Sequence, residues 1–189
     1  RHRAVRVAQV TFPDTLGVGR MTGRPSWLGG PERQTTAPSV EEQVRRALAD
    51  RTNGWWIAEA LSAFDYLEPD FGYRLDEVSL HFRGSSIRYV GRIFELHISY
   101  DPEDTGRVSA ELWSREDLAA DVEHPRALAV NDVLRTRDPS AVLPDTRATH
   151  VPQGDVRGAL TTWATRLREL APDVLRGEWP SDVEVMYLW

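Results

Sequence analysis

The chain has 189 residues, which is enough for one domain of ordinary size, and it contains no cysteine. Disulfide frameworks, thiolate zinc sites and cysteine nucleophiles are therefore excluded. Residues 39–189 hold 17 arginines against 27 acidic residues, and the resulting net charge of about −10 disfavours nucleic acids and favours basic partners.

All 23 basic residues are arginine, which we attribute to a GC-rich genome. No apolar run approaches about 18 residues, the length that a membrane-spanning helix needs. Arginines interrupt the opening RHRAVRVAQVTF too often for a secretory segment. We therefore expect a soluble, cytoplasmic protein that does not bind membranes.

Residues 1–38 are predicted to form a mobile leader. They contain five glycines and four prolines and show no sustained apolar period. Gly17, Gly19 and Gly23 superficially suggest a phosphate loop, but their spacing differs from the dinucleotide-binding pattern, and Pro25 prevents the helix that such a loop requires. Because the chain does not begin with methionine, it stays open whether this leader belongs to the native product.

Two amphipathic helices are predicted after the leader. The first begins at Ser39, which forms a capping box with Glu42. Its apolar stripe is Val40, Val44, Ala47 and Leu48. The second follows Gly54 and continues until Pro69 and Gly72 end it. Its stripe is Ile57, Ala60, Leu61, Phe64 and Leu67.

Between Tyr73 and Trp113 the apolar residues alternate with polar ones, which predicts four β-strands. The connections between these strands are short: RGS, then Gly91-Arg92, then DPEDTG. Short connections favour pairing of consecutive strands. The segment is therefore expected to form an antiparallel meander with one apolar face.

The last third of the chain is predicted to be mainly helical. One helix is expected in HPRALAVNDVLRTRDP, stopped by Pro139, and a longer one starts near Asp155. The buried stripe of the longer helix is Val156, Leu160, Trp163, Leu167 and Leu170. The apolar tail is expected to dock as a short strand. The sequence therefore predicts an α+β fold, a four-stranded antiparallel meander with amphipathic helices packed on one face, in a single domain over residues 39–189.

The polar face of the predicted sheet carries the candidate functional residues, which are His81, Arg88, Glu95, His97, Glu111 and Trp113. A type II′ turn at Gly91-Arg92 places Arg88 opposite Glu95. The next hairpin places His97 opposite Glu111, although a register two residues away fits the alternation equally well.

Three functions fit such a face: a general acid and base pair, a metal site of histidine and glutamate, or a partner-binding surface. The two histidines lie on strands two apart, about 10 Å between strand axes, which disfavours a shared metal ion. A solvated face with cross-strand ion pairs is the plain alternative. We predict no catalytic residue, metal or cofactor, and a partner-binding surface of Arg88, Glu95, His97, Glu111 and Trp113.

Two segments carry a family resemblance: DFGYRL leading into SIRYVGRIFELHISYDP, and the ending LRELAPDVLRGEW. With the helical opening they resemble small uncharacterised actinobacterial proteins of the immunity-like kind that accompany toxins. The resemblance covers about residues 40–180. It implies a non-enzymatic role with a protein partner, and it assigns no functional residues.

The leading hypothesis is a non-enzymatic cytoplasmic protein-binding module. Its specific form is an immunity-type protein that neutralises a basic toxin through its acidic surface. The alternative hypothesis is a small enzyme or ligand-binding domain that uses the polar sheet face around His97 and Glu111. A deep pocket in which those side chains converge would favour the alternative. The sequence leaves the identity of the partner and the oligomeric state open.

Overall fold

A computed structural model of the chain describes residues 38–81, 84–102, 107–144, 153–183 and 186–187. The predicted leader, residues 1–38, lies outside the described residues apart from Pro38. The strands are β1 (Arg74–His81), β2 (Gly84–Val90), β3 (Phe94–Asp101), β4 (Arg107–Ser114), β5 (Arg126–Ala129) and β6 (Met186–Tyr187). The helices are α1 (Val40–Ala49), α2 (Gly54–Ala63), α3 (Leu67–Phe71), α4 (Arg115–Ala119), α5 (Val130–Arg137), α6 (Gln153–Leu170) and α7 (Pro172–Leu175).

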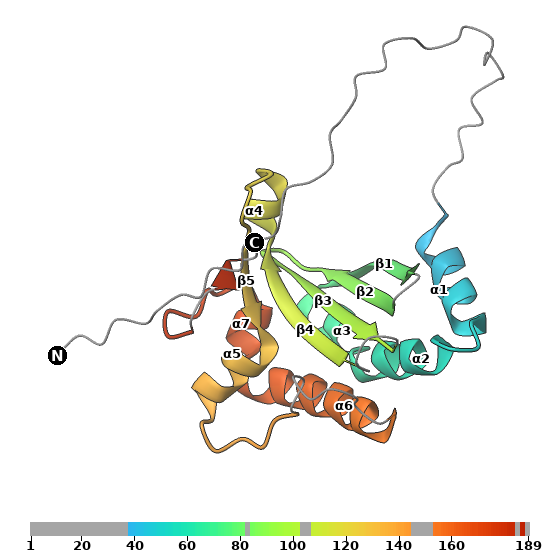
Figure 1. The fold of residues 1–189 in the computed structure, drawn as a ribbon. Helices are drawn as coiled ribbons and strands as arrows, with labels where there is room; N and C mark the ends of the chain where they lie inside the picture. The colour runs from blue at the N-terminus through green and yellow to red at the C-terminus, as the bar shows by residue number, and fades with distance from the viewer. Residues whose placement is uncertain (1–37, 82–83, 103–106, 145–152, 184–185, 188–189) are drawn as a thin grey trace, which may run out of the picture. The chain divides into compact units, whose positions relative to one another are not determined.

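The described strands form one antiparallel sheet in the order β1-β2-β3-β4-β5-β6 (Figure 1). The four strands predicted between Tyr73 and Trp113 are confirmed, and so is the α+β class with a meander. The strand count is larger than predicted, because β5 and β6 extend the sheet beyond β4.

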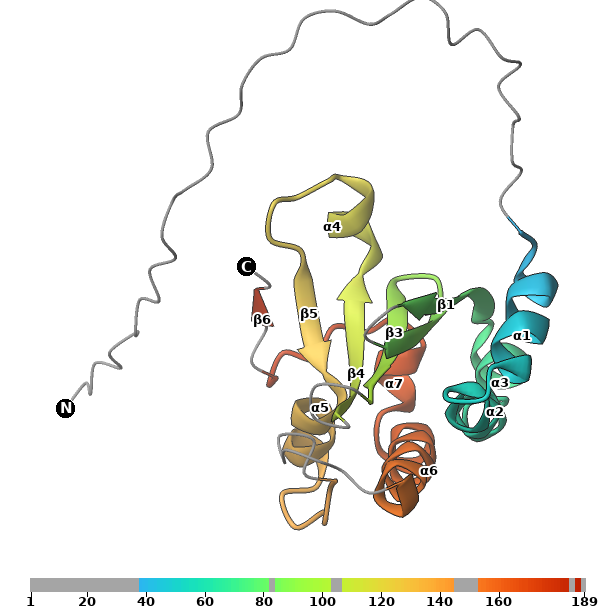
Figure 2. The same cartoon turned by 45° about the vertical axis from the view of Figure 1, so that its right-hand side comes forward.

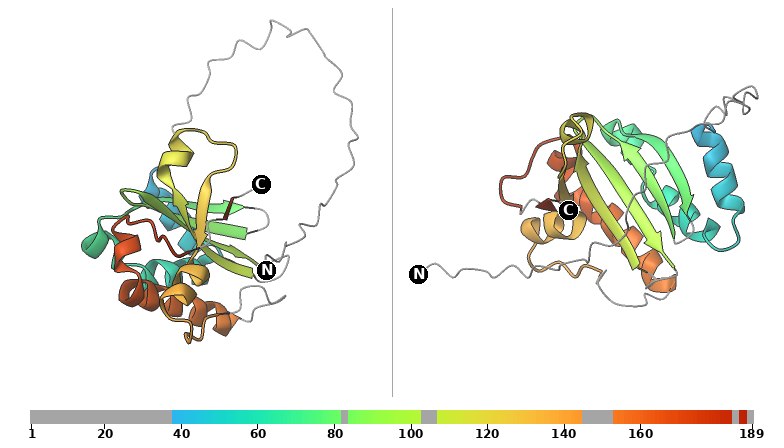
Figure 3. Two further views of the ribbon diagram at one scale, coloured as in Figure 1. Left: turned by 90° about the vertical axis from the view of Figure 1, so that its left-hand side faces the viewer. Right: turned by 45° about the horizontal axis from the view of Figure 1, so that its top comes forward.

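Helices α2, α3, α6 and α7 lie on one face of the sheet (Figure 2). We call this the inner face, and the opposite side the outer face. Near the middle of the sheet the strand side chains of the inner face are fully buried, among them Ile87, Leu96, Ile98 and Leu112, whereas Leu80 on the edge strand is 40% exposed. They join the helix stripes in one apolar cluster, as the alternation predicts. The right-hand view of Figure 3 looks onto the outer face, with α6 behind the strands.

Helix α1 lies beside β1 at the edge of the sheet (Figure 1). Its start is confirmed, because the Ser39 hydroxyl accepts a hydrogen bond from the Glu42 amide at 3.3 Å. The carboxylate of Glu42 instead pairs with Arg45 and Arg46. Of the predicted apolar stripe only Ala47 is buried, and Leu48 is 45% exposed. The helix is thus held by a narrow contact.

The single helix predicted from Gly54 to Gly72 is in fact two helices, and this prediction was wrong. Helix α2 ends at Ala63, a turn follows, and α3 ends at Gly72, whose φ of 70° is the left-handed conformation that glycine adopts easily. Pro69 lies in the first turn of α3, where its missing N–H removes no helical hydrogen bond. It therefore does not stop the helix.

Of the helix predicted in HPRALAVNDVLRTRDP only Val130–Arg137 is helical, because residues 126–129 form β5. Ala127 and Leu128 are both buried, and a short apolar run of this kind does not distinguish a strand from a helix. Helix α5 then runs to Arg137, and Asp138 ends it before Pro139, as predicted. The tail pairs with β5 through Met186 and Tyr187, which confirms the predicted short strand.

Helix α6 begins at Gln153, close to the predicted start. Val156, Leu160, Trp163 and Leu167 of its stripe are fully or almost fully buried, while Leu170 is half-buried. The indole N–H of Trp163 donates to Asn131 on α5 at 2.7 Å. This bond ties the last long helix to the neighbouring short one.

Candidate functional site

Strand pairing arranges the outer face in rows that cross the strands. One row is Glu77, Arg88, His97 and Glu111, on β1 to β4 in order. The next row is Arg74, Val90, Glu95 and Trp113. On the other side of the first row lie four serines, Ser79, Ser86, Ser99 and Ser109. All five predicted binding residues thus lie in two adjacent rows.

The predicted register of the β2–β3 hairpin was wrong by two residues. Arg88 lies opposite His97, and Glu95 lies opposite Val90. The Gly91 amide donates to the Phe94 carbonyl at 2.9 Å, so the turn residues are 92 and 93. Since side chains alternate with period two, the shift left every side chain on its predicted face.

Gly91 is required by packing and not by turn geometry. A Cβ atom at this position would lie 2.6 Å from the ring of Tyr73. Its φ is not positive, since Gly72 and Gly177 are the glycines with positive φ in the described part of the chain. The expected type II′ turn needs positive φ at its first central residue, which Gly91 does not have, and the observed turn lies one residue further on.

Of the two registers that fit the alternation for β3 and β4, the structure has the one with His97 opposite Glu111, which also places Trp113 opposite Glu95. The contacts run along each strand, however. His97 Nε2 lies 3.1 Å from Glu95 Oε2, and Trp113 Nε1 donates to Glu111 Oε2 at 3.2 Å. The rings of His97 and Trp113 stack, with centroids 5.1 Å apart and planes inclined by 21°. We call these four residues the Trp113 cluster.

Arg88 belongs to a separate group on β1 and β2. Its Nη2 lies 2.7 Å from Asp76 Oδ2 and 3.1 Å from Glu77 Oε2. Its Nε is buried without a hydrogen-bond partner. Asp76 was missed by the sequence analysis because a β-bulge between Leu75 and Glu77 breaks the alternation there. A bulge leaves no signal in a period-two pattern.

Arg115 is a second residue that the sequence analysis missed. Its Nη1 donates to the Gly91 carbonyl at 2.9 Å, and its Nε lies 3.9 Å from Glu95 Oε1. It is the first residue of α4, where the strand alternation has ended. His81 is exposed and pairs with Gly84 at the far end of β1, so the structure does not bring it to His97.

The Trp113 cluster is partly shielded but open to a partner. The side chain of Glu95 is 14% exposed and that of His97 is 29% exposed. Within the described residues no group of three histidine, aspartate or glutamate side chains is placed to hold a metal ion. The four serines beside the cluster form no side-chain hydrogen bonds in the part of the chain that the structure describes.

An ion pair between α4 and β5 ties together the two ends of the connection that follows β4. Arg126 Nε and Nη2 donate to the two carboxylate oxygens of Asp117 at 2.7 and 2.8 Å, and the Arg126 amide adds a bond of 2.9 Å. The guanidinium of Arg126 chiefly, with its amide and Ser114, lowers the pKa of Asp117 to about 2. Arg126 also stacks on Trp179. The connection after Trp113 is therefore rigidly anchored.

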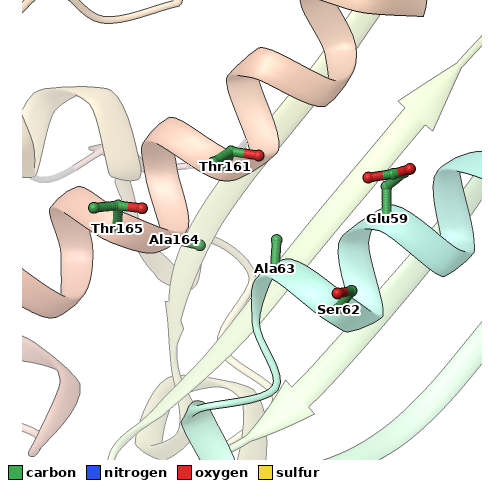
Figure 4. Close-up of a pocket in the computed structure, with 6 residues that line it drawn as sticks. All are labelled: Glu59, Ser62, Ala63, Thr161, Ala164 and Thr165. Carbon is green, nitrogen blue, oxygen red and sulfur yellow. The ribbon is translucent and has the colours of Figure 1, made fainter.

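A groove of about 240 Å³ lies between α2 and α6 (Figure 4). Its lining residues are Glu59, Ser62, Ala63, Thr161, Ala164 and Thr165. Glu59 is engaged by Arg157 at 2.7 Å. The groove belongs to the helical layer, so His97 and Glu111 do not line it.

Comparison with family models, with curated proteins and with solved structures found no match to this chain. The resemblance to immunity-like proteins therefore stays a prediction. None of the helices in the described residues is both long and apolar enough to pass through a membrane.

Proposed function

We propose that the protein is a non-enzymatic module of the cytoplasm that binds a basic protein through the outer face of its sheet. The observation that carries this proposal is the Trp113 cluster, an aromatic pair held between two carboxylates on a rigid sheet. Tryptophan and histidine held in fixed positions lose little conformational entropy on binding, which suits an interface anchor.

Charge supports a basic partner. The outer face carries Asp76, Glu77, Glu95, Asp101 and Glu111 against Arg74, Arg88, Arg107 and Arg115, so the acidic balance comes mainly from residues 39–189 as a whole, with 27 acidic residues against 17 arginines. Complementary charge speeds encounter and disfavours acidic competitors. An immunity-type protein that neutralises a basic toxin is the specific form of this proposal, and the sequence resemblance supports it.

The geometry gives less support to a small enzyme or ligand-binding domain on the outer face. The carboxylates of Glu95 and Glu111 each bond to the edge of a ring, and the stacked rings fill the space between them. The groove that the structure describes lies in the helical layer, between α2 and α6. His97 and Glu111, on which the alternative hypothesis depends, therefore do not line this groove.

The test is binding to a purified basic partner. Tagged full-length protein is used at low salt to capture proteins from the host, and each captured protein is then purified and titrated against the wild type. Glu111→Arg should weaken binding at least about tenfold, because it reverses a charge at the centre of the face. The matched control is Asp155→Arg, the same reversal at an exposed position on α6, which should change the Kd less than about twofold.

Two results would contradict the proposal. One is that no captured basic protein binds the purified wild type directly at low salt. The other is equal weakening by Glu111→Arg and Asp155→Arg, since that result would reflect net charge and not a defined face.

A further inference from the structure

The Trp113 cluster combines the two features that attract a cation. Each carboxylate lies against the edge of one ring, Glu95 against His97 and Glu111 against Trp113. The stacked rings present π-faces, which carry partial negative charge. A cation placed on this stack would meet ring faces and carboxylate oxygens together.

The protein's own packing indicates which cation fits. Three aromatic rings of the described residues are covered by guanidinium groups of the same chain. The pairs are Arg126 over Trp179 at 4.8 Å, Arg168 over Tyr66 at 5.2 Å and Arg176 over Phe71 at 5.9 Å. No guanidinium within the described ranges lies over Trp113 in this way. Trp113 has carboxylates beside it, Glu95, which Arg115 also approaches at 3.9 Å, and Glu111, but no guanidinium of the described residues covers its ring.

The ring of Trp113 is partly accessible. Its neighbours across the strands are Glu95 on β3 and Ala127 on β5, and Ala127 is fully buried. Trp113 is half-buried, and the side chain of His97 is 29% exposed. The stack is thus supported from below and accessible from outside.

We infer that the Trp113 cluster anchors an arginine side chain of the basic partner, an inference that rests on the proposed function. A guanidinium is planar, so it stacks on an aromatic ring while its N–H groups reach a carboxylate. A lysine ammonium carries the same charge but has no plane to stack. The anchor therefore selects arginine over lysine, and a charged side chain over a neutral isostere.

The probe is a blocked pentapeptide, Gly-Gly-Xaa-Gly-Gly, with arginine, lysine or citrulline at the centre. Nitrogen-15-labelled full-length protein is titrated with each peptide, and the indole N–H resonance of Trp113 is followed after assignment through Trp113→Phe. The arginine peptide should shift this resonance with saturation at millimolar concentration. The lysine peptide should bind about fivefold more weakly, and citrulline should give no saturable shift.

A charge variant that keeps the shape of the site completes the test. Glu111→Gln should weaken the arginine peptide at least about threefold, because it removes one negative charge beside the stack. Glu41→Gln is the matched control at an exposed carboxylate on α1, and it should leave the affinity unchanged. Equal shifts with arginine and citrulline, or an unchanged affinity in Glu111→Gln, would overturn the arginine anchor.

The peptide titration and the partner experiment fail separately. If a basic partner binds through the outer face but the arginine peptide leaves Trp113 unmoved, the interface stands and the arginine anchor is wrong. If the arginine peptide gives a saturable shift of the Trp113 resonance but Glu111→Arg weakens the binding of no basic protein, the proposed protein-binding function is wrong.

Discussion

At the residue scale, buried hydrogen bonds that join distant parts of the chain decide local stability. Trp56 on α2 donates its indole N–H to the hydroxyl of Ser85 on β2 at 2.6 Å, and both residues are buried. Asp117 and Arg126 form a comparable link at the base of the β4–β5 connection. Each link leaves an unpaired polar group if one partner is removed.

Replacement of Ser85 by alanine is expected to lower the free energy of unfolding by about 1–3 kcal/mol, because the indole N–H of Trp56 stays buried without an acceptor. Urea denaturation followed by circular dichroism measures the change. Ser86→Ala is the matched control on the outer face, and we expect a change within about 0.5 kcal/mol. Equal effects of the two substitutions would show that the Trp56 bond contributes little.

Asp117 makes the stability of the protein depend on acidity. Its pKa is about 2 in the folded protein and 3.8 ordinarily, so folding favours the ionised form. The stabilisation is present above the ordinary pKa and is lost as the pH falls from there toward about 2. Asp117→Asn should cost about 1–2 kcal/mol at neutral pH, with allowance for solvent screening.

The measurement for Asp117 is a series of urea denaturation curves between neutral pH and about pH 2.5. The difference in free energy of unfolding between wild type and Asp117→Asn should become smaller as the pH falls below the ordinary aspartate pKa. Ser86→Ala, which removes no ionisable group, should change the free energy of unfolding by the same amount at every pH. A difference that stays constant with pH would rule out ionisation of Asp117 as its cause.

At the element scale, helix α1 protects the edge of the sheet. The side-chain oxygen of Gln43 accepts a hydrogen bond from the Val78 amide at 2.9 Å, on a strand that pairs with a neighbour on one side. An open strand edge pairs readily with other chains. The narrow contact of α1 therefore has a function beyond its small buried area.

Gln43→Ala is expected to lower the free energy of unfolding by about 1 kcal/mol and to increase self-association, because the Val78 amide loses its partner. Denaturation curves and sedimentation velocity measure the two effects. Glu41→Ala, an exposed position on the same helix, is the control and should change neither. Unchanged association in Gln43→Ala would show that other contacts of α1 suffice to cover the edge.

At the scale of the whole molecule, one apolar cluster links the sheet to the helices on both ends of the chain. Leu112 is fully buried near the middle of the sheet and belongs to this cluster. A shared core of this kind favours cooperative unfolding, in which no part melts alone. Cooperative unfolding is therefore what the prediction of one domain over residues 39–189 leads us to expect.

Leu112→Ala is expected to lower the free energy of unfolding by about 2–5 kcal/mol, because it opens a cavity in the shared core. The unfolding transition of the whole domain should shift to a lower denaturant concentration. Tryptophan fluorescence and far-ultraviolet circular dichroism should report the same single midpoint in wild type and variant. Two separate transitions, or a shift seen by one probe alone, would contradict the single domain.

The sequence by itself determined the features that depend on local geometry. Alternation between residues 74 and 114 is a property of the extended backbone, so the four strands and the face of every predicted binding residue follow from it. Ser39 begins α1 through its own hydroxyl, and Gly72 ends α3 through its left-handed backbone, both as expected. For the same reason, the predicted candidate residues all lie on one surface.

Only the tertiary structure decided how those side chains pair. Arg88 lies opposite His97 and not Glu95, and the ring of Tyr73 packs against Gly91 of the same hairpin, a contact that no local pattern encodes. The bulge at Asp76 and the reach of Arg115 have the same non-local origin. Residues 126–129 became a strand because β4 and β6 lie beside them. Periodicity reports the direction of a side chain, whereas its partner depends on contacts between segments far apart in the sequence.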